Sequence, residues 1–122
     1  MANILLVDDI SFIKKIEKNV LESSGHIIVG DASNGEDAIR LYREKRPDIV
    51  IMDITMPVLN GIEALEKILS IDAKANVIMC SALAHERILL KAIKAGAKEY
   101  IIKPFTTERL ISTIEKVLAH SK

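Results

Sequence analysis

Residues 49–53 read Ile-Val-Ile-Met-Asp, an unbroken apolar run that ends on an aspartate. Residues 4–8, Ile-Leu-Leu-Val-Asp, and residues 77–81, Val-Ile-Met-Cys-Ser, repeat this pattern with a polar residue last. A strand with one wet face alternates apolar and polar residues, whereas a parallel strand that helices cover on both faces is apolar throughout. The three runs therefore predict the buried central strands of an α/β fold.

The rest of the chain alternates short strand patterns with segments of helical period. The expected strands span residues 4–8, 26–31, 48–53, 76–81 and 99–103, and each connection is about a dozen residues or longer, as a parallel crossover requires. No Ser/Gly-rich linker divides the chain, and the last helical pattern runs almost to its end. We predict one α/β domain over residues 1–122, with a five-stranded parallel doubly wound sheet and no output domain.

The composition excludes several classes of function. The 17 basic and 17 acidic side chains cancel, which leaves no overall charge to attract nucleic acid or an anionic membrane. A single cysteine, Cys80, permits no internal disulfide, and no apolar run is long enough for a signal peptide or a membrane span. We therefore expect a cytoplasmic monomer that recognises its partners locally and binds neither nucleic acid nor membrane.

Polar side chains follow four of the five expected strands. They are Asp8 and Asp9 after the first strand, Asp53 at the end of the third, Ser81 at the end of the fourth and Lys103 at the end of the fifth. In a doubly wound sheet the ligand site lies at the carboxyl ends of the strands, where these groups would meet. Three converging carboxylates need a shared cation, and oxygen ligands suit Mg²⁺.

Such a site can support phosphoryl transfer to a carboxylate. Attack by Asp53 on phosphorus brings anions together, so the attack needs a metal ion and further positive groups around the transferred oxygens. Lys103 offers an ammonium and Ser81 a hydroxyl donor for this purpose.

Several segments of the sequence resemble response-regulator receiver domains. They are Leu5-Leu6-Val7-Asp8-Asp9, Met52-Asp53-Ile54-Thr55-Met56-Pro57 with Asn60-Gly61, Ser81-Ala82, Ala95-Gly96-Ala97 and Lys103-Pro104-Phe105. Their order and spacing cover essentially the whole chain, and within the family the chain is most similar to the stand-alone chemotaxis regulators. The resemblance implies a flavodoxin-like sheet with the strand order 2-1-3-4-5.

The resemblance also implies a role for each residue of the site. Asp53 would accept the phosphoryl group, and Lys103 would pair with Asp53 or with that group. The implied Mg²⁺ ligands are the side chains of Asp9 and Asp53 and the backbone carbonyl of Thr55, with Asp8 holding a metal-bound water.

A second set of implied residues would convert phosphorylation into a signal. Ser81 would be the switch hydroxyl and Tyr100 the switch aromatic, and the Lys103–Pro104 peptide would be cis. The signalling face would comprise the helix over about residues 84–95, the fifth strand and the last helix. The implied partners are a histidine kinase, a protein target such as a flagellar motor switch protein, and a phosphatase.

Two enzyme or carrier classes compete with this interpretation. A phosphatase of the haloacid-dehalogenase type also uses an aspartyl nucleophile, but it needs a second aspartate two residues later, where this chain has Thr55. A flavodoxin-like electron carrier needs a phosphate loop after the first strand, where Asp8 and Asp9 would repel a flavin phosphate. We therefore expect a protein that catalyses only its own phosphorylation and dephosphorylation.

Leu83 favours an alternative within the family. This alternative is a phosphorelay intermediate that passes its phosphoryl group to a histidine phosphotransfer protein. Many receivers carry a polar side chain at this position that helps to place the hydrolytic water, and Leu83 is apolar. We predict that Leu83→Glu speeds self-dephosphorylation, measured as the decay of the phosphorylated protein after the phosphodonor is removed. Equal decay rates would contradict this role for Leu83.

Overall fold

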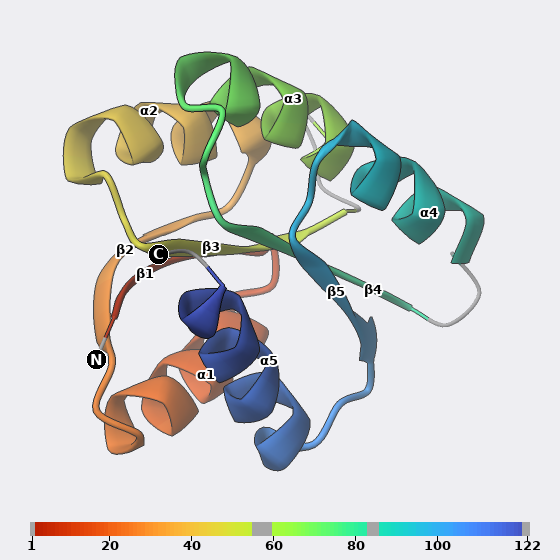
Figure 1. Cartoon of the computed structure of the whole chain (residues 1–122). Helices are drawn as coiled ribbons and strands as arrows, with labels where there is room; N and C mark the ends of the chain where they lie inside the picture. The colour runs from red at the N-terminus through yellow and green to blue at the C-terminus, as the bar shows by residue number, and fades with distance from the viewer. Residues whose placement is uncertain (1, 55–59, 83–85, 121–122) are drawn as a thin grey trace.

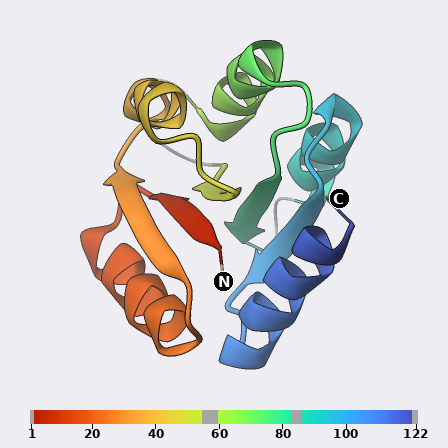
Figure 2. The same ribbon diagram turned by 60° about the vertical axis from the view of Figure 1, so that its left-hand side comes forward.

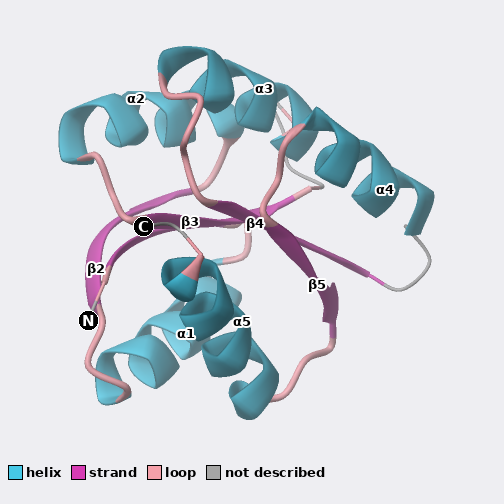
Figure 3. Cartoon of the chain, viewed as in Figure 1, coloured by secondary structure: helices cyan, strands magenta, loops and turns pink. Residues whose placement is uncertain are grey.

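The computed structural model describes residues 2–54, 60–82 and 86–120, in which five strands alternate with five helices (Figures 1 and 3). The strands are β1 (Asn3–Val7), β2 (Ile27–Ala32), β3 (Ile49–Asp53), β4 (Val77–Ala82) and β5 (Glu99–Lys103). The helices are α1 (Ser11–Ser23), α2 (Gly35–Lys45), α3 (Gly61–Ile71), α4 (Glu86–Ala95) and α5 (Thr107–Ala119). Within the described residues no helix is long and apolar enough to cross a bilayer.

The strands form one parallel sheet in the order β2-β1-β3-β4-β5. This confirms the predicted α/β class, the strand order and all five strands, whose ends differ from the expected ones by at most one residue. Helices α1 and α5 cover one face, and α2, α3 and α4 cover the other (Figures 1 and 2). The carboxyl ends of β1 and β3, neighbours at the centre of the sheet, therefore lie side by side.

The core consists of two apolar layers, one on each face of the sheet. Leu5 and Val7 pack with the layer beneath α2, α3 and α4, whereas Ile4 and Leu6 pack with the layer beneath α1 and α5. Successive side chains of a strand point to opposite faces, so a strand covered on both sides needs apolar residues at every position. This geometry explains the unbroken apolar runs in the sequence.

Helix α1 departs from the pattern that its sequence predicts. The helical period of the sequence predicts a packing stripe of Ile13, Ile16 and Val20, but Ile16 is 45% exposed. The buried residues of α1 are instead Lys14, Glu17 and Leu21. Two of these three carry an ionisable group, because this face of α1 covers the polar edge of the sheet as well as its apolar surface.

Gly61 fixes the start of α3 beside the end of β3. Its N–H donates to the carbonyl of Ile54 at 2.8 Å, and a Cβ at this position would lie 2.7 Å from the Ile54 Cα. Asn60 caps the helix by accepting a hydrogen bond from the Glu63 N–H. The chain can approach Asp53 this closely only because residue 61 lacks a side chain.

We predict that Gly61→Ala lowers the free energy of unfolding by about 1–3 kcal/mol, because the added methyl group collides with backbone that cannot rotate away. Urea denaturation monitored by circular dichroism measures this change. Gly30→Ala is the matched control, since a Cβ at Gly30 would lie an ordinary 3.5 Å from the Leu5 Cδ1. Equal losses in the two variants would contradict the steric explanation.

Candidate functional site

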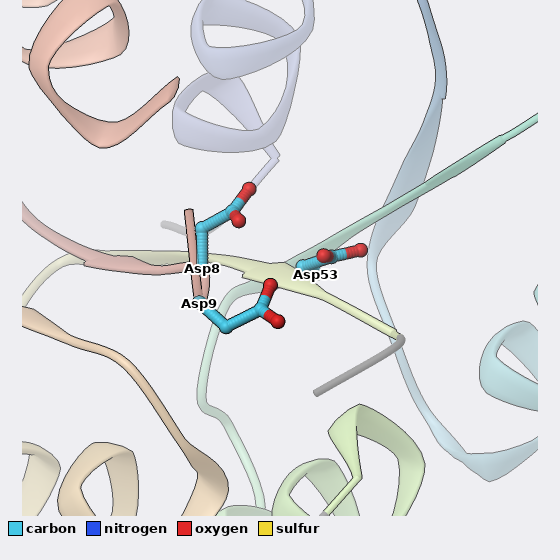
Figure 4. A group of neighbouring side chains, drawn as sticks. All are labelled: Asp8, Asp9 and Asp53. Atoms are coloured by element: carbon cyan, nitrogen blue, oxygen red, sulfur yellow. The ribbon is translucent and has the colours of Figure 1, made fainter. Parts of the chain in front are cut away.

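Three carboxylates gather at the carboxyl edge of the sheet. Asp8 and Asp9 follow β1 and Asp53 ends β3, and one carboxylate oxygen from each lies within 4.8 Å of the others (Figure 4). Asp8 is buried, Asp53 is half-buried and Asp9 is exposed. The topology thus brings together the three aspartates that the sequence singled out.

Asp8 is held from three directions. Its backbone N–H donates to the Ala32 carbonyl at 3.0 Å, and its Oδ1 accepts the Ile10 N–H at 2.9 Å. Its Oδ2 accepts a hydrogen bond from the Lys103 Nζ at 2.9 Å. The orientation of this buried carboxylate is therefore fixed by the end of β2, by the start of α1 and by β5.

Lys103 supplies the positive charge of the site. Its Nζ lies 2.9 Å from the Asp8 Oδ2 and 3.8 Å from the Asp53 Oδ2, so the shorter contact is with Asp8. Burial alone would lower the pKa of Lys103, but the hydrogen bond to Asp8 and the charges of Asp53 and Asp8 outweigh burial and raise it. The Lys103–Pro104 peptide is cis, as the resemblance implies.

The two switch candidates occupy β4 and β5. Ser81 is buried and follows Cys80, which is the residue of β4 opposite Asp53. Tyr100 is half-buried and borders a hollow of about 250 Å³ with Leu89 and Ile102. Thr55 and Leu83, also named by the sequence, lie outside the described residues.

Lys14 ties α1 to the same edge of the sheet. Its Nζ donates to the Ser33 Oγ at 2.8 Å, the Asp31 Oδ1 at 3.2 Å and the Ala32 carbonyl at 3.4 Å. The Ala32 carbonyl is also the acceptor for the Asp8 N–H. Lys14 therefore helps to position the loop that carries Asp8. The sequence interpretation did not single out this residue.

Glu17 is a further carboxyl near the site that the sequence interpretation missed. It is only 4% exposed, and burial raises the pKa of Glu17 to about 7, with the charges of Asp8 and Asp53 adding to the shift and Lys103 opposing it. One signal was available, because Glu17 lies four residues after Ile13 and three before Val20. These spacings place it on the apolar face of the helix.

The site carries an excess of negative charge. Asp8, Asp9 and Asp53 contribute three carboxylates, whereas Lys103 contributes one ammonium within ion-pair distance of two of them. Among the described residues the cluster offers carboxylate oxygens and no nitrogen or sulfur ligand, which matches the oxygen preference of Mg²⁺. The three aspartates could therefore hold a metal ion of this kind.

The model of the response regulator receiver domain family matches residues 4–115. The chain belongs to this family. Protein CcdB of Bacillus subtilis is 47% identical over 120 residues, which cover 98% of this chain and all of that protein. The chemotaxis protein CheY of Thermotoga maritima is 44% identical over 93% of this chain and 95% of its own length. Receivers of the CheY type are thus its relatives over nearly the full length.

Solved receiver structures agree with the fold. A chain of the CheX–CheY–BeF3–Mg²⁺ complex of Borrelia burgdorferi has a TM-score of 0.91 and 36% identity, covering 95% of this chain and 88% of its own length. The response regulator domain of Thermotoga maritima CheB has a TM-score of 0.84 and 34% identity, and the match covers 98% of this chain and 95% of that domain. The predicted CheY-like receiver fold is therefore confirmed.

The raised pKa of Glu17 predicts a pH-dependent stability. Between about pH 4.5 and pH 7 the folded chain keeps a proton on Glu17 that the unfolded chain releases, so this residue makes stability fall as pH rises through that window. Glu17→Gln removes this pH dependence. The free energy of unfolding of the variant, minus that of wild type, should therefore increase by up to about 3 kcal/mol from pH 5 to pH 8.

Urea denaturation at both pH values, without divalent cations, measures the difference. Glu22→Gln is the control, because Glu22 is exposed on the same helix and its substitution should leave the wild-type pH dependence intact. If the stability of Glu17→Gln changed with pH in the same way as that of wild type, the raised pKa of Glu17 would be refuted.

Proposed function

We propose that this protein is a phosphorylation-activated response regulator that takes a phosphoryl group from a histidine kinase onto Asp53. An Oδ atom of Asp53 attacks phosphorus, the bond from phosphorus to the donor imidazole nitrogen breaks, and an acyl phosphate forms on Asp53. The observation that carries the proposal is the position of Asp53, which ends β3 beside Asp8, Asp9 and the Lys103 Nζ.

The neighbours of Asp53 have complementary tasks in this proposal. Asp8, Asp9 and Asp53, with the backbone carbonyl of Thr55, would hold Mg²⁺. A bound magnesium ion would neutralise charge on the transferred oxygens. Lys103 lies close enough to Asp53 to move its ammonium from Asp8 toward the new phosphoryl oxygens. The protein would catalyse only its own phosphorylation and dephosphorylation.

Phosphorylation would change the face formed by α4, β5 and α5. A phosphoryl group adds roughly −1.5 to −2 charges and three acceptor oxygens at the end of β3. Ser81 would donate to one of these oxygens, and the Tyr100 ring would move into the space this frees next to β5. Leu90, 61% exposed, and Lys91 and Lys94 give this face apolar and basic groups for a protein partner.

The proposed pathway is chemotaxis in the cytoplasm, with a flagellar motor switch protein as target and a chemotaxis-type histidine kinase as donor. Chemotaxis CheY proteins at 42% to 46% identity support this assignment, together with the CheY chain in the CheX complex. That complex, in which CheY is bound to CheX, also supports a third protein partner, and the expected phosphatase is our candidate for it. Leu83 favours the second candidate, a phosphorelay intermediate, because an apolar residue there suits a long-lived phosphoryl group.

Intact-mass spectrometry after incubation with a small acyl-phosphate donor and Mg²⁺ tests the proposed chemistry. We expect wild type to gain one phosphoryl group, and to gain none when a chelator removes the metal. Asp53→Asn should gain none, because an amide nitrogen or oxygen is a poor nucleophile toward phosphorus.

Asp48→Asn is the matched control, since Asp48 is exposed at the opposite end of β3 and should leave phosphorylation unchanged. A phosphoryl group on Asp53→Asn would place the acceptor elsewhere. Binding of the phosphorylated protein to a motor switch protein, rather than transfer to a histidine phosphotransfer protein, separates the two candidate pathways.

A further inference from the structure

An apolar groove runs between α1 and the segment that joins β5 to α5. It encloses about 380 Å³, close to the lower limit of small-molecule sites, which is about 300 Å³. Its apolar lining comes from Ile13, Ile16, Val20, Phe105 and Leu110. Helices α1 and α5 lie on the same face of the sheet, opposite α2, α3 and α4 (Figure 2).

Glu17 also lines this groove, and its carboxyl is unusual because it is buried without a polar partner among the described residues. Its side chain is more than nine-tenths buried, yet within the described part of the chain it forms neither a hydrogen bond nor an ion pair. In that part of the chain no side-chain oxygen sealed from solvent lacks a hydrogen-bond partner. The Glu17 carboxyl oxygens therefore keep contact with solvent, at a residue that lines the groove.

Lys103 does not act as an ion-pair partner of Glu17. It lines the groove as well, but its Nζ donates a hydrogen bond to the Asp8 Oδ2 at 2.9 Å and lies 3.8 Å from the Asp53 Oδ2. A buried carboxylate without a cation is costly, and an incoming positive charge would relieve that cost.

We propose that this groove binds a small apolar molecule that carries one amino group. Its ammonium would donate to the Glu17 carboxylate, and its apolar body would lie against Ile13, Val20 and Phe105. An anionic ligand is disfavoured, because Glu17 lies in the field of Asp8 and Asp53. The volume suits a single ring or a short chain.

A set of three probes with one shared body tests the proposal. The probes are 2-phenylethylamine, 2-phenylethanol and phenylacetate, which are cationic, neutral and anionic at about pH 8. Each is titrated into the ¹⁵N-labelled, unphosphorylated protein without divalent cations, and the backbone amide shifts are followed by NMR. The readout does not involve phosphorylation, so it can fail or succeed independently of the proposed function.

We expect the amine to shift the amides of residues 13–20 and 105–110 with a dissociation constant of about 1–10 mM, as its few heavy atoms allow. The alcohol should bind about five- to tenfold more weakly, and the acid more weakly still. Glu17→Gln, which keeps the side-chain shape, should reduce amine affinity by the same factor and leave alcohol affinity unchanged.

Ile16→Lys is a second variant that needs no change in the buried carboxyl. Ile16 is exposed at the groove, so a lysine there would place a second positive charge at its mouth and weaken amine binding several-fold by repulsion. Ile27→Lys makes the same exchange on β2, at an isoleucine that is equally exposed and does not line the groove, and it should leave binding intact.

Three outcomes would overturn the proposal. They are no saturable shift with the amine, equal affinity for the amine and the alcohol, or amine affinity that Glu17→Gln leaves unchanged. Amide shifts confined to α4 would likewise show that the probe binds elsewhere.

Discussion

The rest of the site depends on the repulsion between three carboxylates that parallel pairing forces together. Because β1 and β3 are neighbours with their carboxyl ends on one side, Asp8 and Asp53 have to lie close to one another. Lys103 reaches both from β5, which is separated from β1 by two strands. Its ammonium offsets one charge and leaves an excess of negative charge that a divalent cation would neutralise, which the attack of Asp53 on an anionic phosphoryl group requires in the proposed function.

The fold could be predicted from the sequence because local rules determine it. The runs at residues 4–8, 49–53 and 77–81 showed which strands are covered on both faces, and the length of the connections showed that the strands are parallel. The same topology predicted that Asp8, Asp9 and Asp53 would meet. The roles assigned to Ser81 and Tyr100 rest on the family resemblance and stay predictions.

The properties of α1 could not be predicted in this way, because they depend on how a helix is rotated against distant parts of the chain. Periodicity favoured an apolar stripe, whereas Lys14 is buried by acceptors from the end of β2, 17 to 19 residues away. Glu17 is buried beside groups from β1, β3 and β5. The preference of Lys103 for Asp8 over Asp53 is likewise a matter of distance, which no sequence pattern encodes.

The Ala32 carbonyl has a consequence for how this corner of the molecule opens. One oxygen accepts hydrogen bonds from the Asp8 N–H and from the Lys14 ammonium, so the end of β1, the end of β2 and helix α1 meet at a single atom. Lifting α1 from the sheet breaks the Lys14 hydrogen bond to this oxygen, and it also breaks the hydrogen bond that the Ile10 N–H, at the start of α1, donates to the Asp8 Oδ1. These three segments therefore form one cooperative opening unit, and the acidic loop loses its order whenever the first helix detaches.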